Sequence, residues 1–93
     1  DMIDTGGSLC NAANALVKVG GAKAVYACAT HGVFSRNAFD YIEDSVIEEV
    51  VVHNTIPLPA DCSCKKIKQL DVAPIFALAI SHIHCGTSIA DLF

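Results

Sequence analysis

The sequence predicts an α/β fold, built as a partial parallel sheet flanked by helices. Strand-like apolar runs alternate along the chain with segments of helical periodicity, and the joins between them are short and contain glycine or proline. With 93 residues the chain is long enough for one small domain or for a piece of a larger one. Its hydrophobic content of 53% is typical of strands covered on both faces, and we expect part of that cover to come from outside this chain.

The first third of the chain should form a strand, a helix and a second strand. Met2 and Ile3 have the character of the end of a buried strand. Apolar residues then recur at helical spacing, at Leu9, Ala12, Ala13, Leu16 and Val17. The glycine pair at 20–21 is a helix stop signal, and the β-branched and aromatic content of residues 22–30 (AKAVYACAT) favours a strand.

The middle of the chain continues the alternation. Residues 31–35 (HGVFS) are expected to form a loop, after which Ser35 or Asn37 can cap a second helix. The apolar positions of that helix are Ala38, Tyr41 and Ile42. Residues 47–57 (IEEVVVHNTIP) predict a third strand that stops at Pro57.

A fourth strand and a final helix are expected after residue 65. Residues 66–72 (KIKQLDV) predict the strand, Pro74 suits the first turn of the helix, and Gly86 ends it. The helix carries Ile75, Leu78, Ala79 and His82. The last seven residues, 87–93, read as a short tail or a single helical turn.

Crossovers of this kind place the loops that follow the strands on one edge of the sheet, where α/β proteins bind ligands. We therefore expect the site near the segments that follow Ile3, Ala29 and Val52. His31 lies at this edge and could be an acid, a base or a phosphate donor, although a structural role is favoured. His53 at the end of the third strand is interpreted in the same way.

Charge and hydropathy exclude some classes of function. Six basic and ten acidic residues give a formal net charge of -4, and the densest basic stretch is KKIK at 65–68, so nucleic acid is not an expected partner. No apolar run approaches the length of a membrane span, and no secretion signal opens the chain. No membrane association and a cytoplasmic location are therefore expected.

The five cysteines predict reduced thiols, because they are odd in number and follow no disulfide spacing. Cys10 and Cys28 are interpreted as small buried hydrophobic residues. A zinc set could be imagined from Cys62, Cys64, His82, His84 and Cys85. A single residue between the first two cysteines is a poor clamp for zinc, so no metal ligands are predicted in this chain.

The opening stretch DMIDTGGSLC is the strongest functional candidate. A helix N-terminus presents unpaired N–H groups to an anion, and glycine at Gly6 and Gly7 lets the backbone approach a phosphate and take up positive φ. Thr5 and Ser8 add hydroxyl groups. The stretch lacks the lysine of the triphosphate loop and the third glycine of the dinucleotide fingerprint.

Two acids refine this interpretation. Asp1 and Asp4 flank the strand end, where carboxylates would repel a bare phosphate but can accept hydrogen bonds from ribose hydroxyls or face Mg²⁺ through water. The stretch can also be a tight turn between strand and helix, with Ser8 as the helix cap. The pattern alone favours neither interpretation.

The chain resembles the ribose-phosphate pyrophosphokinases, also called phosphoribosyl pyrophosphate synthetases, which have the type I phosphoribosyltransferase fold. The resemblance begins with DMIDTGGSLCNAA and continues, in family order, through GAKAVYACATHGVFS, VVVHNTIP, KIKQLDVAPIFALAI and SIADLF. It covers nearly all of residues 1–93 but only about the last third of a family chain, as the C-terminal part of one phosphoribosyltransferase-like domain whose N-terminal remainder is absent.

This resemblance implies transfer of diphosphate from ATP to the 1-hydroxyl of ribose 5-phosphate, with Mg²⁺ as cofactor. Asp4, Thr5, Gly6, Gly7 and Ser8 match the loop that holds the 5-phosphate. Asp1 matches the second of two adjacent acids that address the ribose hydroxyls. The ATP-binding residues and the mobile catalytic loop precede the matching stretch in family members, so the catalytic residues are expected upstream and the segment should be inactive alone.

The C-terminal tail matches a family region that borders a regulatory phosphate or ADP site at a subunit interface. Ser88, Ile89 and Phe93 match that region, whereas Ala90 stands where serine is common and lacks its hydroxyl. The alternative is a hydrophobic tail packed on a neighbour. A homo-oligomer is expected in either case.

Two other functions remain open. The chain could belong to a noncatalytic regulatory homologue that joins the synthetase assembly, although the intact stretch from Thr5 to Ser8 favours the enzyme. A nucleobase phosphoribosyltransferase shares the acid-Thr-Gly-Gly loop, but ATHGVFS and NTIP argue against it.

Overall fold

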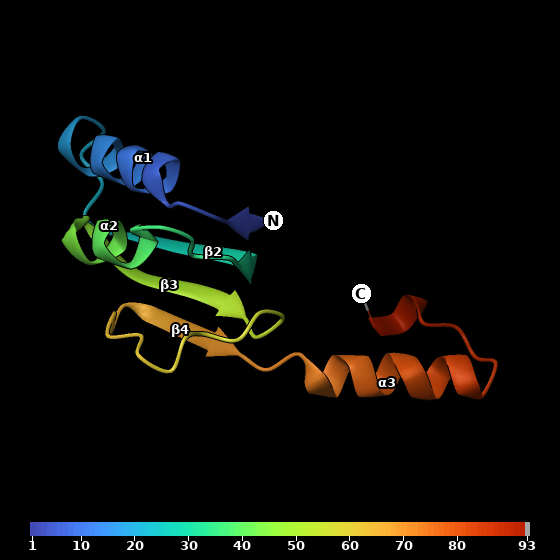
Figure 1. Cartoon of the computed structure of the whole chain (residues 1–93). Coiled ribbons are helices and arrows are strands. Elements are labelled where there is room, and N and C mark those ends of the chain that lie inside the picture. Colours follow the sequence, from blue (N-terminus) through green and yellow to red (C-terminus); the bar gives the residue numbers. More distant parts are fainter. Residues whose placement is uncertain (93) are drawn as a thin grey trace.

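A computed structural model describes residues 1–92 as a parallel α/β arrangement, which confirms the predicted fold class. Four parallel strands form one sheet in the order β1-β2-β3-β4 (Figure 1). The strands are β1 (Met2–Ile3), β2 (Val25–Gly32), β3 (Ile47–His53) and β4 (Ile67–Leu70). The helices are α1 (Gly7–Lys18), α2 (Ala38–Asp44), α3 (Ala73–His84) and the short 3-10 helix η1 (Ala90–Leu92).

The core lies on one face of the sheet, where α1 and α2 cover the strands. Val50 and Val52 of β3 alternate into it, and Ile47 joins them from before a register irregularity, so that all three are almost completely buried. The helices contribute Cys10, Ala13, Ala38 and Ile42, and the segment before β4 contributes Cys64. This alternation between buried and exposed positions is why the apolar runs of the sequence form strands and not helices.

The opposite face of the sheet is uncovered within the described residues. Tyr26 of β2 is 70% exposed, and Cys28, two residues later, is also exposed. The expectation that Cys28 is buried is therefore wrong, because the residue points to the face that no helix of this chain covers. Cys10, which faces the core from α1, is buried as expected.

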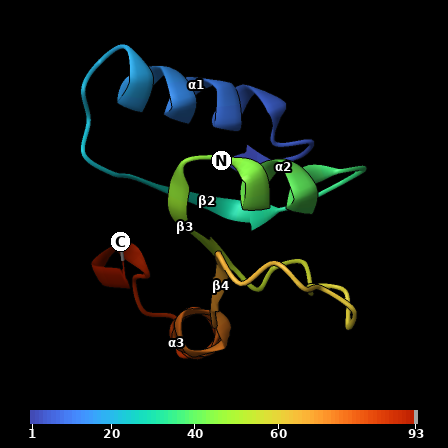
Figure 2. The ribbon, with the colours of Figure 1, turned by 90° about the vertical axis from the view of Figure 1, so that its left-hand side faces the viewer.

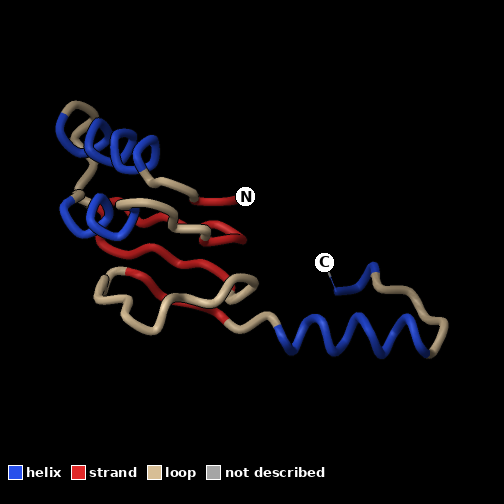
Figure 3. Tube along the Cα trace, in the orientation of Figure 1, coloured by secondary structure: helices blue, strands red, loops and turns tan. Residues whose placement is uncertain are grey.

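Helix α3 projects beyond the edge of the sheet (Figures 1 and 3). Figure 2, turned by a quarter, views α3 along its axis and shows it standing apart from α1 and α2. None of its residues is buried, and its exposed large side chains are Ile75, Phe76, Leu78, Ile80 and Ile83. The predicted helix and its first-turn Pro74 are confirmed. Among residues 1–92 the helix contacts η1, and none of its apolar side chains is fully buried.

Several element boundaries differ from expectation because pairing between strands decides them. Residues 31–35 are not simply a loop: His31 and Gly32 extend β2, since they pair with Met2 and Ile3 of β1. On α1, Leu16 is 53% exposed and Ala12 is exposed, because the helix meets the core along the line of Cys10 and Ala13.

Among the described residues, no helix combines the length and apolarity needed to cross a membrane.

Candidate functional site

The loop between β1 and α1 brings most of the predicted ligand residues to one place. Gly6 has φ of +79° and precedes the first helical residue, so glycine is required there. Gly7 has an ordinary φ and belongs to α1; the expectation of positive φ is therefore correct for Gly6 and wrong for Gly7. A Cβ atom added at either glycine would meet no neighbouring atom within 3.4 Å, so space alone does not exclude a side chain at either position.

The backbone N–H groups of this loop are unpaired in the described chain. The first hydrogen bond of α1 runs from the Cys10 N–H to the Gly6 carbonyl oxygen, at 2.9 Å. Within residues 1–92, none of the N–H groups from Thr5 to Leu9 donates to a protein acceptor. The alternative in which Ser8 caps the helix is wrong in this structure, because Ser8 lies inside α1 and the cap position is held by Gly6.

A cavity of about 370 Å³ lies beside the loop and gathers five of the six predicted residues. Its lining is made by Asp1, Met2, Ile3, Asp4, Thr5, Gly6, Ser8, Leu9, Cys28 and Ala29. Asp1 and Asp4 therefore border the same cavity as Thr5, Gly6 and Ser8 of the loop. The arrangement offers N–H donors for an anion and acceptors for hydroxyl groups within one cavity.

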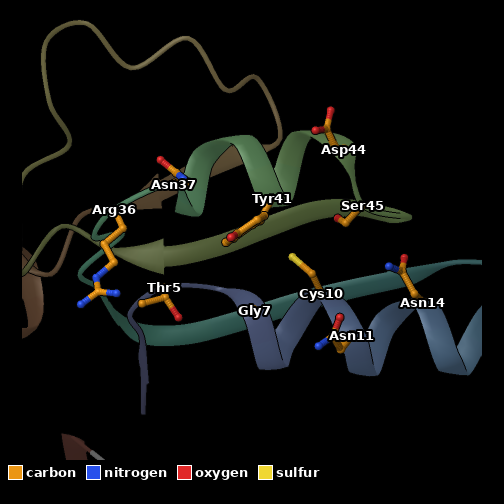
Figure 4. A pocket seen from close by; sticks show the side chains of 10 residues that line it. All are labelled: Thr5, Gly7, Cys10, Asn11, Asn14, Arg36, Asn37, Tyr41, Asp44 and Ser45. Carbon is orange, nitrogen blue, oxygen red and sulfur yellow. The ribbon is translucent and has the colours of Figure 1, made fainter.

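A second cavity, of about 660 Å³, lies between α1 and α2. Figure 4 shows its lining, with Arg36 and Thr5 at one end and Asn14 and Asp44 toward the other. The remaining lining residues are Gly7, Cys10, Asn11, Asn37, Tyr41 and Ser45. Gly7 opens to this cavity and not to the first one, so the loop separates two spaces.

From sequence alone Arg36 is expected to be a solvated residue at a helix start or an interface contact. The structure places it on the second cavity, beside the predicted phosphate loop, with φ of +55°. Its position in the segment after β2 is the signal that could have found it, because such segments meet at the same sheet edge as the loop after β1.

The segment after β2 also holds the loop in place. Ser35 donates its hydroxyl hydrogen bond to Oδ1 of Asp4, and the Ser35 N–H donates to the Asp4 carbonyl oxygen at 3.1 Å. Asn37 occupies the cap position of α2 but makes no side-chain cap hydrogen bond, and neither does Ser35. Asn37 therefore holds the predicted cap position without the expected side-chain hydrogen bond, and the hydroxyl of Ser35 is engaged by Asp4.

The two histidines at the sheet edge have different surroundings. His31 Nδ1 lies 2.7 Å from Thr55 Oγ1, a hydrogen bond that ties β2 to the segment after β3. His53 lines a third cavity, of about 420 Å³, on the uncovered face of the sheet, together with Asp1 and Thr30. The contact with Thr55 supports the structural interpretation of His31.

The C-terminal tail lies apart from these cavities. The Ser88 hydroxyl accepts a hydrogen bond from the Ala90 N–H at 3.1 Å, and the Ser88 carbonyl oxygen lies 2.7 Å from His82 Nδ1. Ser88 and Ile89 are exposed and line neither cavity beside the loop. Phe93 lies outside the described residues.

The cysteines do not form a metal site in the described part of the chain. All five are free, and residues 1–92 hold no group of three or more His, Cys, Asp or Glu side chains that could ligate an ion. Burial raises the pKa of the Cys64 thiol, and a hydrogen bond with Glu43 adds to this. Such a thiol stays protonated, unlike a zinc ligand.

The chain covers a segment of much longer relatives. It is 54% identical to the ribose-phosphate pyrophosphokinase of Clostridium acetobutylicum over 93 residues, and 48% identical to that of Bacillus subtilis. All of this chain is matched in each case, but only 29% of each relative. The chain therefore spans less than a third of the length of these curated relatives.

A solved structure agrees with the sequence relatives. The crystal structure of phosphoribosylpyrophosphate synthetase from Mycobacterium smegmatis superposes with a TM-score of 0.86 at 38% identity, over 92% of this chain and 28% of that one. The family model described as the phosphoribosyl synthetase-associated domain matches residues 1–93. The chain thus belongs to the ribose-phosphate pyrophosphokinase family, as a segment that carries its phosphoribosyl synthetase-associated domain.

Proposed function

We propose that the chain is the C-terminal segment of a ribose-phosphate diphosphokinase and supplies the ribose 5-phosphate half of its active site. The whole protein would transfer diphosphate from ATP to the 1-hydroxyl of ribose 5-phosphate, giving phosphoribosyl pyrophosphate and AMP. The observation that carries the proposal is the run of unpaired amides from Thr5 to Ser8, beside a cavity that Asp1 and Asp4 also line. Family membership makes a sugar phosphate the ligand of choice.

The binding step follows from the chemistry of the loop. The unpaired N–H groups and the N-terminal end of α1 favour the dianionic 5-phosphate without any lysine. The Thr5 and Ser8 hydroxyls add donors, and the Asp1 and Asp4 carboxylates accept hydrogen bonds from ribose hydroxyls. A phosphate alone would meet these acids with its own negative charge, so the site favours a phosphorylated sugar over free phosphate.

The cavity beside the loop offers two carboxylates that could serve Mg²⁺. The ion is commonly held by one or two carboxylates together with waters and substrate phosphates, and Asp1 and Asp4 line the same cavity. These two would hold it, through water, beside the sugar. When bound, the ion neutralises charge on the transferred diphosphate. The chain's own contribution is to orient the sugar so that its 1-hydroxyl faces the donor, since diphosphate transfer depends mainly on positioning.

The remaining functions belong to the rest of the proposed protein. ATP binding and the catalytic residues would come from the portion of the relatives that this chain does not match, so the segment alone should be inactive. The protein would be cytoplasmic and a homo-oligomer. Ser88, Ile89 and Phe93 would border a phosphate or ADP regulatory site, with Ala90 weakening it through its missing hydroxyl.

Hydrogen exchange tests the loop in the full-length protein that carries this chain. Saturating ribose 5-phosphate should slow exchange of the amides from Gly6 to Ser8, because each would then donate to the phosphate. Amides of the glycine pair at 20–21, at the far end of α1, serve as the internal control. Unchanged exchange at Gly6 to Ser8 would count strongly against the proposal.

A substitution separates the enzyme from a noncatalytic homologue. Gly7→Val should weaken ribose 5-phosphate binding in the enzyme, because it places a branched side chain next to the unpaired amides of the loop, from the side of the second cavity. A Cβ at this position meets no atom within 4 Å. Ala15→Val places the same side chain at an exposed position of α1, and this variant should bind normally. A protein in which neither variant nor parent binds the sugar, while assembly with the synthetase persists, would be the regulatory homologue.

A further inference from the structure

The end of β2 and the segment after it run beside residues 1–4 and are joined to them by a series of hydrogen bonds. The His31 N–H donates to the Asp1 carbonyl oxygen at 2.9 Å, and the Val33 and Phe34 N–H groups donate to the Ile3 carbonyl oxygen at 2.9 and 3.2 Å. Ser35 ends the series with its N–H on the Asp4 carbonyl oxygen and its hydroxyl on Asp4 Oδ1. In this series Ser35 provides the side-chain contact.

A tight turn aims Ser35 at Asp4. Phe34 has φ of +50°, an uncommon conformation for a bulky residue. The residue is 6% exposed, and its ring centroid lies 5.2 Å from that of Phe39, with the two rings tilted by 37°. The same ring fills the space over Gly32, where a Cβ would come within 2.3 Å of it. Burial of the Phe34 ring therefore stabilises the turn that brings both the N–H and the hydroxyl of Ser35 to one residue.

Asp4 is exposed and begins the loop whose amides are unpaired. An exposed carboxylate normally samples several rotamers, and ordering it on ligand binding costs conformational entropy. The hydrogen bond from Ser35 selects one orientation before any ligand arrives. It engages Oδ1 and leaves Oδ2 without a protein donor among residues 1–92, and Asp4 lines the cavity beside the loop.

We propose that Ser35 is a positioning residue for sugar-phosphate binding: acting through the Asp4 carboxylate, it fixes the entrance of the loop and orients one acceptor for a ribose hydroxyl. This inference rests on the proposed function, because it assigns Ser35 to the same ribose 5-phosphate site. Ser35 itself touches Asp4 and not the sugar.

The test uses the full-length protein and Ser35→Ala. We expect KM for ribose 5-phosphate to rise about three- to tenfold, with KM for ATP and kcat within about twofold, since one charge-assisted hydrogen bond is lost on the sugar side only. Ser35→Thr keeps the hydroxyl and should restore most of the affinity. Ser81→Ala, on an exposed position of α3, is the matched control and should change nothing.

A double-variant cycle identifies Asp4 as the partner. Asp4→Ala weakens ribose 5-phosphate binding by itself, and adding Ser35→Ala to it should have less than about a twofold further effect, because the two residues share one interaction. Additive losses would overturn the proposal. So would equal rises in KM for both substrates, or a failure of Ser35→Thr to restore affinity, since these indicate a purely structural serine.

Calorimetric titration of the parent protein with ribose 5-phosphate separates the two possible failures. A parent that binds no ribose 5-phosphate refutes the proposed function, and the role of Ser35 with it. A parent that binds the sugar, while Ser35→Ala binds it equally well, refutes the positioning role alone. Thermal unfolding of each variant shows whether a loss of affinity reflects a loss of fold.

Discussion

The sheet with α1 and α2 differs from α3 in what its apolar residues do, although both regions are rich in them. Ile42 of α2 is 0% exposed, whereas Ile80 of α3 is 66% exposed, and no residue of α3 is buried. The two isoleucines lie on helices formed by the same local rules. Only the first has a partner within residues 1–92.

The contrast shows that helix formation and burial are separate outcomes. Pro74 in the first turn and an uninterrupted run of helix-compatible residues suffice to define α3. A helix of 12 residues is nonetheless marginal in water without tertiary packing. The uncovered sheet face at Tyr26 and Cys28 has the same character. Both surfaces carry apolar side chains of the kind usually found in protein interiors, but within residues 1–92 these side chains remain exposed.

The largest expected effect compares the two isoleucines directly. Ile42→Ala should lower the free energy of unfolding by about 2–5 kcal/mol, because it leaves a cavity in the core. Ile80→Ala should change it by less than about 0.5 kcal/mol, since the side chain is already in water. Urea denaturation of both variants measures the difference, and equal losses would mean that α3 is packed against something in solution.

A smaller effect concerns the end of α2. Lys66 Nζ donates to the carbonyl oxygens of Glu43 and Ser45, at 2.9 Å each, and lies 3.3 Å from that of Ile42. Because these carbonyls end the helix, Lys66→Met should cost about 1–2 kcal/mol of stability.

The matched control is Lys68→Met, two residues farther along the chain, in β4. Lys68 is exposed and its ammonium makes no hydrogen bond among residues 1–92, so this variant should be within about 0.5 kcal/mol of the parent. Equal unfolding midpoints in urea for the two variants would contradict a capping role for Lys66.

The connection between β4 and α3 should make the stability of the folded state depend on pH, with an effect smaller than the two above. Asp71 Oδ1 accepts a hydrogen bond from the Ala73 N–H at 2.9 Å and another from Asn54 Nδ2 at 3.0 Å. These donors, the Ala73 N–H first, hold the pKa of Asp71 below its ordinary value of 3.8. The folded state is therefore favoured by this group above pH 3.8, and the contribution is lost as the pH falls through the lower folded pKa.

NMR can follow this connection through the Ala73 amide. Its proton shift should titrate with a midpoint below 3.8, and Asp71→Asn should abolish the titration while it keeps the acceptor oxygen. A midpoint above 3.8, or a shift insensitive to pH from about 2 to about 5, would mean that α3 is not anchored through Asp71.

The part of the candidate site that is built from residues adjacent in sequence could be predicted. An acid, a threonine and Gly6 between a strand end and a helix are adjacent in sequence, so their gathering around one cavity needed no long-range information. The contact between Ser35 and Asp4 joins residues 31 positions apart. Nothing in the local pattern of HGVFS indicates it, because the same serine also suits a helix cap.

Arg36 illustrates the same limit. Its side chain lines the cavity with Thr5 only because β1 and β2 are parallel neighbours whose following segments meet at one edge. Sequence periodicity predicts that strands exist, but not which residues of two distant loops face the same space.

The sequence by itself determined the order and type of the elements, the helix start at Pro74 and the loop from Asp1 to Ser8, because periodicity and backbone preferences act over a few neighbouring residues. The tertiary structure alone decided that β2 continues to Gly32, that Cys28 is exposed and that Ser35 engages Asp4. These outcomes depend on which strands pair and which face the helices cover, and both are settled by contacts between parts of the chain that are distant in sequence.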